Sequence, residues 1–203
     1  MSTDLLPLFP LEVVLFPGMP LPLHIFEPRY KLLIAHCREQ QLEFGVVLSR
    51  KRGPAEVGCS AEILKVIKEY PDGRLDILTV GQNRFRLLQV FEDLPYLQGR
   101  VDFLFEDENA EEAPAPVRLS ELFEEAFLLT GNAAAPPQPQ GGMPWSFHIA
   151  MLLPLTLDTK QLLLELESEG ERQRRLETYL EEWLPQARRA AHLKEKASGN
   201  GHG

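Results

Sequence analysis

The stretch of this sequence that comes nearest to a catalytic or ligand-binding motif runs from Gly53 to Ser60, GPAEVGCS. Its spacing matches the phosphate-binding loop G-x-x-x-x-G-K-[ST], but Cys59 stands where that loop has lysine. Without this cation the terminal phosphates of a nucleotide lose their charge partner. The following residues favour a strand, whereas the motif must open a helix whose N-terminus faces the phosphate. We therefore expect no nucleotide site and no other cofactor.

Other residue types that could support catalysis or bind a metal lack the necessary spacing. The five histidines form no HExxH motif and have no Cys-x-x-Cys pair beside them, so structural or surface roles are favoured. No serine lies in a G-x-S-x-G context, and nothing pairs a serine with a lysine. The acidic cluster at 106–112 lacks the Asp, Asn and Gly spacing of a calcium loop. We expect no catalytic residue and no bound metal.

Three charged residues have the most site-like placement: Glu27, Arg29 and Arg84. Glu27 precedes a predicted helix, and the N-terminal end of a helix favours a carboxylate. Arginine can hold a carboxylate through two parallel hydrogen bonds. We hypothesise that Glu27 pairs with Arg84 and fixes the helix against a sheet; the alternative is that both side chains are merely exposed.

An apolar ribbon at residues 5–34 must position these charges, and six prolines interrupt it. A central strand does not carry so many prolines, because each lacks the N–H that the ladder needs. The ribbon therefore predicts short extended pieces at a sheet margin, with a turn at 16–18. A helix is predicted over 28–39, with Pro28 suited to its first position. One face of that helix carries apolar residues at helical spacing: Tyr30, Leu33, Ile34 and Cys37.

The next segment predicts several short strands. Residues 43–50 and 97–105 alternate apolar and polar side chains, and 57–90 is almost continuously strand-like. Imperfect alternation over 61–70 suggests a bulge. Asp72-Gly73 predicts a tight hairpin turn, and a second turn is expected at 81–83. Short strands at this spacing favour a small closed or partly closed barrel.

The composition changes after residue 105. Residues 106–117 combine acidic side chains with Ala-Pro repeats and predict a solvated linker. Amphipathic patterns over 118–185 predict a helical subdomain, interrupted by a mobile Gly- and Pro-rich loop at 131–144. Ser168–Glu171 fits a capping box at the start of its last helix. The segment 186–203 is expected to be a fraying, flexible tail.

Composition restricts the class of protein. The net charge of −9 over 203 residues argues against non-specific binding to a phosphate backbone. The chain opens MSTDLL without a basic region, and prolines break its first apolar run, so neither a signal peptide nor a membrane span is expected. The two cysteines lie far apart in sequence, which favours a reduced, cytoplasmic protein.

The segments LPLFPL, VLFPG and LPLHIFEPRY closely resemble the opening of the Lon protease N-terminal domain. The resemblance continues through the Asp72-Gly73-Arg74 hairpin and the later KQLLLE segment. It implies an α+β fold: a small PUA-like β-barrel over 1–105 with one inserted helix, followed by a C-terminal helical bundle. The family motif covers nine residues that we expect to be structural: Pro17, Gly18, Glu27, Arg29, Tyr30, Gly58, Gly81, Arg84 and Phe85.

The resemblance also implies a function, that of a non-catalytic module that binds unfolded or hydrophobic polypeptide segments. We expect a stand-alone domain without the ATPase and Ser–Lys protease modules of Lon, acting as a protease adaptor or binding one dedicated partner. The apolar margin could accept an extended peptide as an added strand. Four apolar side chains in the ribbon are the candidate contacts: Phe9, Phe16, Met19 and Phe26.

Two other functions remain open from the sequence. An enzyme of unknown type would use a cleft between barrel and bundle, with convergent ionisable groups. An RNA-binding module is the second, because PUA-like barrels elsewhere bind RNA; the acidity of the chain weighs against it, and a basic groove would favour it. The chain is expected to be a monomer, or a homodimer formed through the apolar margin.

Overall fold

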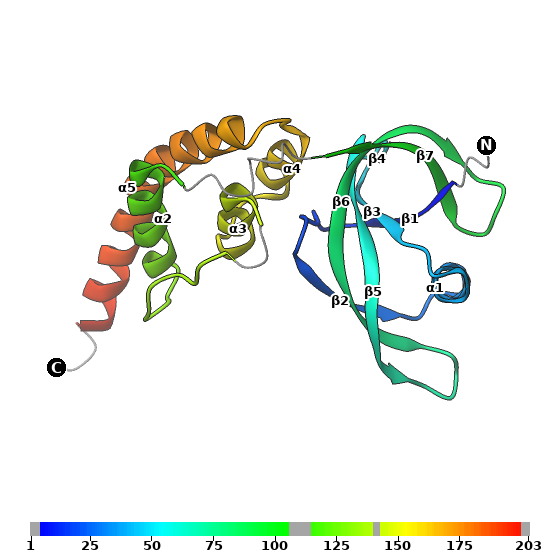
Figure 1. Ribbon diagram of the computed structural model, residues 1–203. Coiled ribbons are helices and arrows are strands. Elements are labelled where there is room, and N and C mark those ends of the chain that lie inside the picture. Colours follow the sequence, from blue (N-terminus) through cyan, green and yellow to red (C-terminus); the bar gives the residue numbers. More distant parts are fainter. Residues whose placement is uncertain (1–4, 106–114, 140–142, 200–203) are drawn as a thin grey trace. The chain divides into compact units, whose positions relative to one another are not determined.

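The computed structural model describes residues 5–105, 115–139 and 143–199, with the backbone alone over 194–199. The chain forms two compact units, which Figure 1 shows in ribbon form. The first, the sheet unit, comprises Met1–Phe105 and Leu157–Glu165. The second, the helical unit, comprises Glu106–Thr156 and Leu166–Gly203.

The sheet unit contains seven strands: β1 (Leu6–Leu11), β2 (Pro20–Ile25), β3 (Phe44–Arg50), β4 (Gly53–Pro54), β5 (Val57–Glu69), β6 (Leu75–Phe91) and β7 (Leu97–Leu104). Antiparallel pairing connects β7, β6, β5 and β3 in that order. β1 pairs antiparallel with β7 and parallel with β3, so the succession of pairings returns to β1. Among the strands of the described residues, β2 pairs with β6 alone.

The position of β1 corrects the expectation that the whole proline-rich ribbon forms a sheet margin. β1 lies between two strands, and its prolines fit because the two ladders are offset. Pro7 pairs only with β7 and Pro10 only with β3, whereas Leu8 pairs on both sides. Each proline can therefore turn its ring nitrogen to a side where no ladder bond is required.

Helix α1 (Pro28–Gln40) confirms the predicted helix over 28–39. The expected apolar face is buried in the core: Tyr30, Leu33, Ile34 and Cys37. Phe9 of β1 stacks on Tyr30 with ring centroids 3.9 Å apart, which ties the helix to the sheet.

The hairpin between β5 and β6 confirms the predicted turn at Asp72-Gly73, where Gly73 has a φ of 77°. Register shifts within β5 confirm the expected bulging. The turn expected at 81–83 is wrong, because β6 continues through it. Gly81 is required for another reason: a Cβ at this position would lie 2.1 Å from the Phe16 carbonyl oxygen of the Phe16–Gly18 turn.

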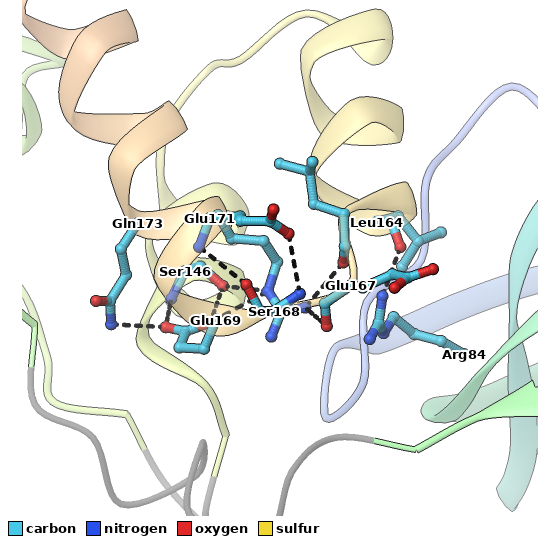
Figure 2. Close-up of polar contacts among 10 residues, drawn as sticks. Arg84, Ser146, Leu164, Glu167, Ser168, Glu169, Glu171 and Gln173 are labelled. Carbon is cyan, nitrogen blue, oxygen red and sulfur yellow. Dashed lines mark hydrogen bonds and ion pairs between the residues drawn. The ribbon is translucent and has the colours of Figure 1, made fainter.

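Helix α4 (Leu157–Glu165) belongs to the sheet unit, although the sequence placed it in a helical subdomain over 118–185. Gln161 explains the difference, since its Nε2 donates to the Val57 carbonyl oxygen of β5 at 2.9 Å. The buried Arg84 of β6 also donates, from Nη1, to the Leu164 carbonyl oxygen at 3.0 Å (Figure 2).

The helical unit contains α2 (Val117–Leu129), α3 (Trp145–Leu152) and α5 (Glu169–Gly199). The predicted capping box is confirmed, with Glu171 N–H donating to Ser168 Oγ at 3.3 Å. α5 continues through 186–199, where fraying was expected, because this segment is rich in Ala, Arg, Lys and Glu, which favour helix. The acidic cluster at 106–112 lies outside the described residues. Of the loop expected at 131–144, residues 131–139 and 143–144 are described, and they form neither helix nor strand.

Candidate functional site

The stretch that resembles a phosphate-binding loop forms strand rather than loop and helix. Gly53 and Pro54 form β4, and Cys59 and Ser60 are buried in β5. Burial raises the pKa of the Cys59 thiol. Burial also raises the pKa of Cys37 to about 12, and both cysteines are free. Neither thiol has the thiolate character that nucleophilic chemistry requires at neutral pH.

A buried polar cluster in the helical unit connects α3 to α5 (Figure 2). Ser146 Oγ donates to Glu169 Oε2 at 2.5 Å, and Arg172 Nε donates to the same oxygen at 3.1 Å. Gln173 Nε2 donates to Glu169 Oε1 at 2.9 Å. All four residues are buried, so the serine and the carboxylate join helices and have no surface on which to meet a substrate. No cluster of metal-binding side chains occurs among the described residues.

The hypothesised Glu27–Arg84 pair is wrong. Glu27 instead accepts a hydrogen bond from Arg29 Nε at 3.0 Å, and the Arg29 guanidinium lies over the Tyr30 ring. β2 ends at Ile25 opposite Leu75, whereas Arg84 is nine residues further along β6, a path of about 30 Å at the rise of an extended strand.

The remaining motif residues have packing roles. The Phe85 ring lies against Gly58, its partner across the β5–β6 ladder, where a Cβ would be 2.6 Å from Phe85 Cζ. Gly18 N–H donates to the Gly81 carbonyl oxygen at 2.8 Å, which fixes the turn that contains Pro17. These motif residues therefore hold the fold.

Of the four candidate peptide contacts, only Phe26 is well exposed. Phe9 and Phe16 are 5% and 0% exposed, so the expectation that they meet a peptide is corrected: they form the core. Met19 is half-buried and packs on that core. Phe26 is 58% exposed and lies two residues before α1, which directs attention to the surface of this helix.

The unpaired edge of β2 is poorly suited to accept an added strand. Leu21 accepts a hydrogen bond from Thr79 Oγ1 of β6, and Met19 accepts one from Gly81 N–H. Backbone groups alternate in direction along a strand, so the backbone groups of Pro20, Pro22 and His24 point away from β6. Since proline has no N–H, His24 has the one backbone N–H of β2 that points outward. Prolines protect exposed edges in this way.

A second edge remains along β5. β3 pairs with β5 only over Cys59–Ala61. Beyond Ala61, β5 pairs with β6 on one side, and no described strand lies on its other side. Two register shifts interrupt this stretch, and the two apolar residues at the shifts, Leu64 and Ile67, are more than half exposed. Bulges shorten the run over which a further strand could pair.

A groove lies between α1 and this edge of β5, and we call it the α1–β5 groove. Its first part has a volume of about 530 Å³ and is lined by Pro28, Lys31, Leu32, Ala35, Arg38, Glu69, Gly73 and Leu75. Its second part has a volume of about 610 Å³ and is lined by Cys37, Arg38, Gln41, Leu42, Glu43, Glu62, Ile63, Lys65 and Val66. Arg38 lines both parts.

The α1–β5 groove is mainly apolar in its first part and mixes apolar with charged side chains in its second. Leu32 is 52% exposed although it is a large apolar residue, and Ala35 and Leu42 are also exposed. Ile63 and Val66 form the opposite wall. Open grooves that combine apolar side chains with charged groups are suited to bind extended peptides.

A polar cluster borders this region beside the β5–β6 turn. Asp76 bonds to His24 Nδ1 at 2.6 Å and accepts from Tyr70 Oη at 2.8 Å. The hydrogen bond from His24, followed by that from Tyr70, lowers the pKa of the Asp76 carboxyl. His24 also stacks on Phe26. These contacts hold Phe26 beside the start of α1.

Sequence reasoning missed most of this groove. The available signal was Leu32, an apolar residue on α1 outside the stripe that faces the core. The open edge of β5 had no local signal, because the sequence of a strand shows which residues alternate between its two faces, but not on which side it lacks a neighbouring strand.

Comparisons with known proteins agree on one family. Residues 5–182 match the family described as the ATP-dependent protease La (LON) substrate-binding domain. A Lon protease of Parabacteroides distasonis is 30% identical over 66% of the chain, and one of Syntrophus aciditrophicus is 29% identical over 80%. The chain spans 18% and 23% of the lengths of these two relatives.

A solved structure supports the same assignment. The crystal structure of a Lon N-terminal domain protein from Xanthomonas campestris is 32% identical, with a TM-score of 0.67, and covers 87% of this chain and 97% of that one. The N-terminal domain of a Mycobacterium avium complex Lon protease shares the fold at 17% identity and a TM-score of 0.57, covering 88% of this chain and 98% of that one.

Proposed function

The chain belongs to the LON substrate-binding domain family, and on that premise we propose that its α1–β5 groove binds extended hydrophobic segments of other polypeptides. The family suggests a polypeptide-binding module. The observation that carries the proposal is the exposed apolar wall of α1, centred on Leu32, opposite an edge of β5 that lacks a strand on that side among the described residues.

The proposed binding mode uses side chains more than main chain. Addition of a peptide strand gives affinity through backbone hydrogen bonds and preference through pockets. The bulges in β5 limit such pairing to short runs, so the apolar walls of the groove provide most of the contact. Lys31, Arg38, Glu62 and Glu69 at the rim orient the peptide ends or its polar residues.

A binding experiment tests this groove. A fluorescent peptide in which Leu, Val and Phe alternate with Ser is titrated with the full chain, and binding is followed by fluorescence anisotropy. Leu32→Glu should weaken binding by about tenfold or more, because a leucine side chain that the bound peptide buries contributes about 1.5–3 kcal/mol. N-methylation of alternate residues in the peptide should lower its affinity for the parent chain less than Leu32→Glu lowers the affinity of the chain for the unmodified peptide, since few backbone hydrogen bonds form.

The matched control is Leu88→Glu, which makes the same change at a residue of β6 that is 58% exposed and lines none of the grooves described. Its affinity should stay within about twofold of the parent chain. Equal loss in both variants, or no binding by the parent, would overturn the proposal for this groove.

The architecture and the cellular role complete the proposal. We take the succession of strand pairings as a PUA-like barrel and the helical unit as the bundle that follows it. The chain is cytoplasmic and has no catalytic activity of its own. It acts as an adaptor that presents bound segments to a Lon-type protease. That role predicts faster degradation of an unfolded substrate by a Lon protease when the parent chain is present than when Leu32→Glu replaces it. Among the described helices, none combines the length and the hydrophobicity needed to span a bilayer.

A further inference from the structure

A second groove of the sheet unit is distinguished by its charge. It has a volume of about 640 Å³ and lies where β3 ends and β5 begins. Four cations line it, together with two carboxylates: Arg50, Lys51, Arg52, Arg86, Glu56 and Glu165. We call it the basic groove. Four cations in one hollow stand out because the chain as a whole carries a net charge of −9.

The cations come from three parts of the fold. Arg50 ends β3, Lys51 and Arg52 form the exposed turn into β4, and Arg86 lies on β6. Gly53 makes this turn with a φ of 117°, a conformation that favours glycine. The turn holds two cationic side chains at one rim of the groove, facing solvent.

Some of the charge is already balanced within the protein. Arg50 lies 3.8 Å from Asp158 of α4, a long and exposed ion pair that contributes little. Glu165 accepts a hydrogen bond from Gln161 Nε2 at 2.9 Å. Lys51 and Arg52 are both exposed and contribute most directly to the attraction that the groove exerts on an approaching anion, and Glu56 opposes it.

We propose that the basic groove binds an acidic polypeptide segment, one in which Asp and Glu residues are spaced along an extended chain. Guanidinium groups bind carboxylates through paired hydrogen bonds. A nucleic acid fits less well, because the lining contains no aromatic side chain on which a base could stack. Glu56 and Glu165 also repel a continuous row of phosphates, whereas spaced carboxylates can avoid them.

The site extends the proposed function, because the α1–β5 groove and the basic groove would select different segments of one polypeptide. The two grooves share no lining residue, and they lie at opposite ends of β3, one beside Glu43 and the other beside Arg50. Each can therefore be tested while the other stays intact.

The experiment titrates the full chain into a labelled peptide of about 12 residues in which Asp and Glu alternate with Ser. Binding is followed by anisotropy at about 50 mM and about 300 mM salt, since exposed charge pairs are screened as salt rises. We expect binding that falls at least about fivefold at the higher salt. A peptide with Asn and Gln in place of the acids should not bind.

Charge-reversing variants locate the site. Lys51→Glu with Arg52→Glu should lower affinity at least about tenfold, while Glu56→Gln should raise it. Arg174→Glu with Arg175→Glu makes the same change in charge on the exposed surface of α5, and affinity should then stay within about twofold. Leu32→Glu should leave acidic-peptide binding unchanged, which separates this test from that of the α1–β5 groove.

Three results would overturn the proposal: no binding of the acidic peptide at low salt, equal loss in the two charge-reversed double variants, or tighter binding of a uridine oligonucleotide of equal charge. The last result would assign the groove to RNA instead.

Discussion

Glu169 is the residue that fixes the start of α5 to the first turn of α3. Its carboxylate accepts hydrogen bonds from the Ser146 N–H at 2.9 Å, the Ser146 hydroxyl, Arg172 and Gln173. The Arg172 guanidinium also lies over the Phe147 ring, 4.5 Å from its centroid. A buried ion pair adds little net stability when it is complete, but the loss of one partner leaves the other charge buried.

We predict that Glu169→Ala lowers the free energy of unfolding of the helical unit by about 3–5 kcal/mol, because the charged Arg172 stays buried without the Glu169 carboxylate beside it. The measurement is urea unfolding followed by tryptophan fluorescence. Both tryptophans of the chain, Trp145 and Trp183, belong to this unit, so the signal reports on it selectively.

The control for this prediction is Glu124→Ala, which removes an exposed carboxylate from α2 of the same unit. It should change the free energy of unfolding by about 0.5 kcal/mol or less. If the two variants unfold at the same urea concentration, the buried cluster does not carry the stability assigned to it.

The sequence could predict such polar contacts only when the partners were close along the chain. The capping box of Ser168 and Glu171 follows from a spacing of three residues, and it is present. Ser146 and Glu169 are 23 positions apart, with helix α4 between them, so no local pattern relates them. The Glu27–Arg84 hypothesis failed for the same reason: helix-end chemistry indicated that Glu27 could bind a cation, but not which arginine the fold would bring near.

At the scale of elements, β1 and β2 show how one proline-rich ribbon yields two different strands. In β1 the prolines fall where only one neighbour is paired, so the strand can lie inside the sheet. In β2 they face outward along an unpaired edge. This edge is apolar and extended, and its prolines prevent it from templating another chain.

We predict that Pro22→Thr increases self-association of the chain, because it restores an outward N–H between two other outward-facing residues of β2. Light scattering coupled to size-exclusion chromatography, run at several protein concentrations, measures the effect as a rise in mean mass relative to the parent chain.

Pro71→Thr provides the comparison, since Pro71 is exposed in the turn of the β5–β6 hairpin and not on a strand edge. It should leave the mass distribution of the parent chain unchanged. A Pro22→Thr protein that is as monodisperse as Pro71→Thr would show that the prolines of β2 do not protect this edge.

Elements with a strong local period were predictable, and the order of strands in the sheet was not. The helix over 28–39 followed from its apolar spacing and from Pro28, and the hairpin at 72–73 from Asp-Gly. The turn expected at 81–83 was wrong because Gly81 signals a close backbone contact with Phe16 as readily as it signals a turn. The α1–β5 groove depends on which edge stays unpaired, and only the assembled sheet determines that.

At the scale of the whole molecule, the two units interleave along the chain. The sheet unit takes Met1–Phe105 and later Leu157–Glu165, so a boundary at residue 105 does not separate it from the rest. α4 supplies two contacts with buried groups of that unit: Gln161 donates to Val57, and the Leu164 carbonyl oxygen accepts from Arg84. Composition suggested a boundary at 106, where the acidic segment begins, but composition does not reveal that a later helix returns to the sheet.

We predict that a fragment of residues 1–105 is less stable than the complete sheet unit by at least about 2 kcal/mol, because two hydrogen bonds to buried groups are lost. The reference is a chain in which residues 106–156 are replaced by a flexible Gly/Ser linker of the same length, joined to 157–165, so that α4 can reach its position. Urea unfolding followed by far-UV circular dichroism measures both proteins. Gln161→Ala should lower the stability of the linked chain by part of this difference, since it removes the bond to Val57 while α4 stays in place. Equal stability of the fragment and the linked chain would mean that α4 is dispensable and that residues 1–105 form the folding unit by themselves.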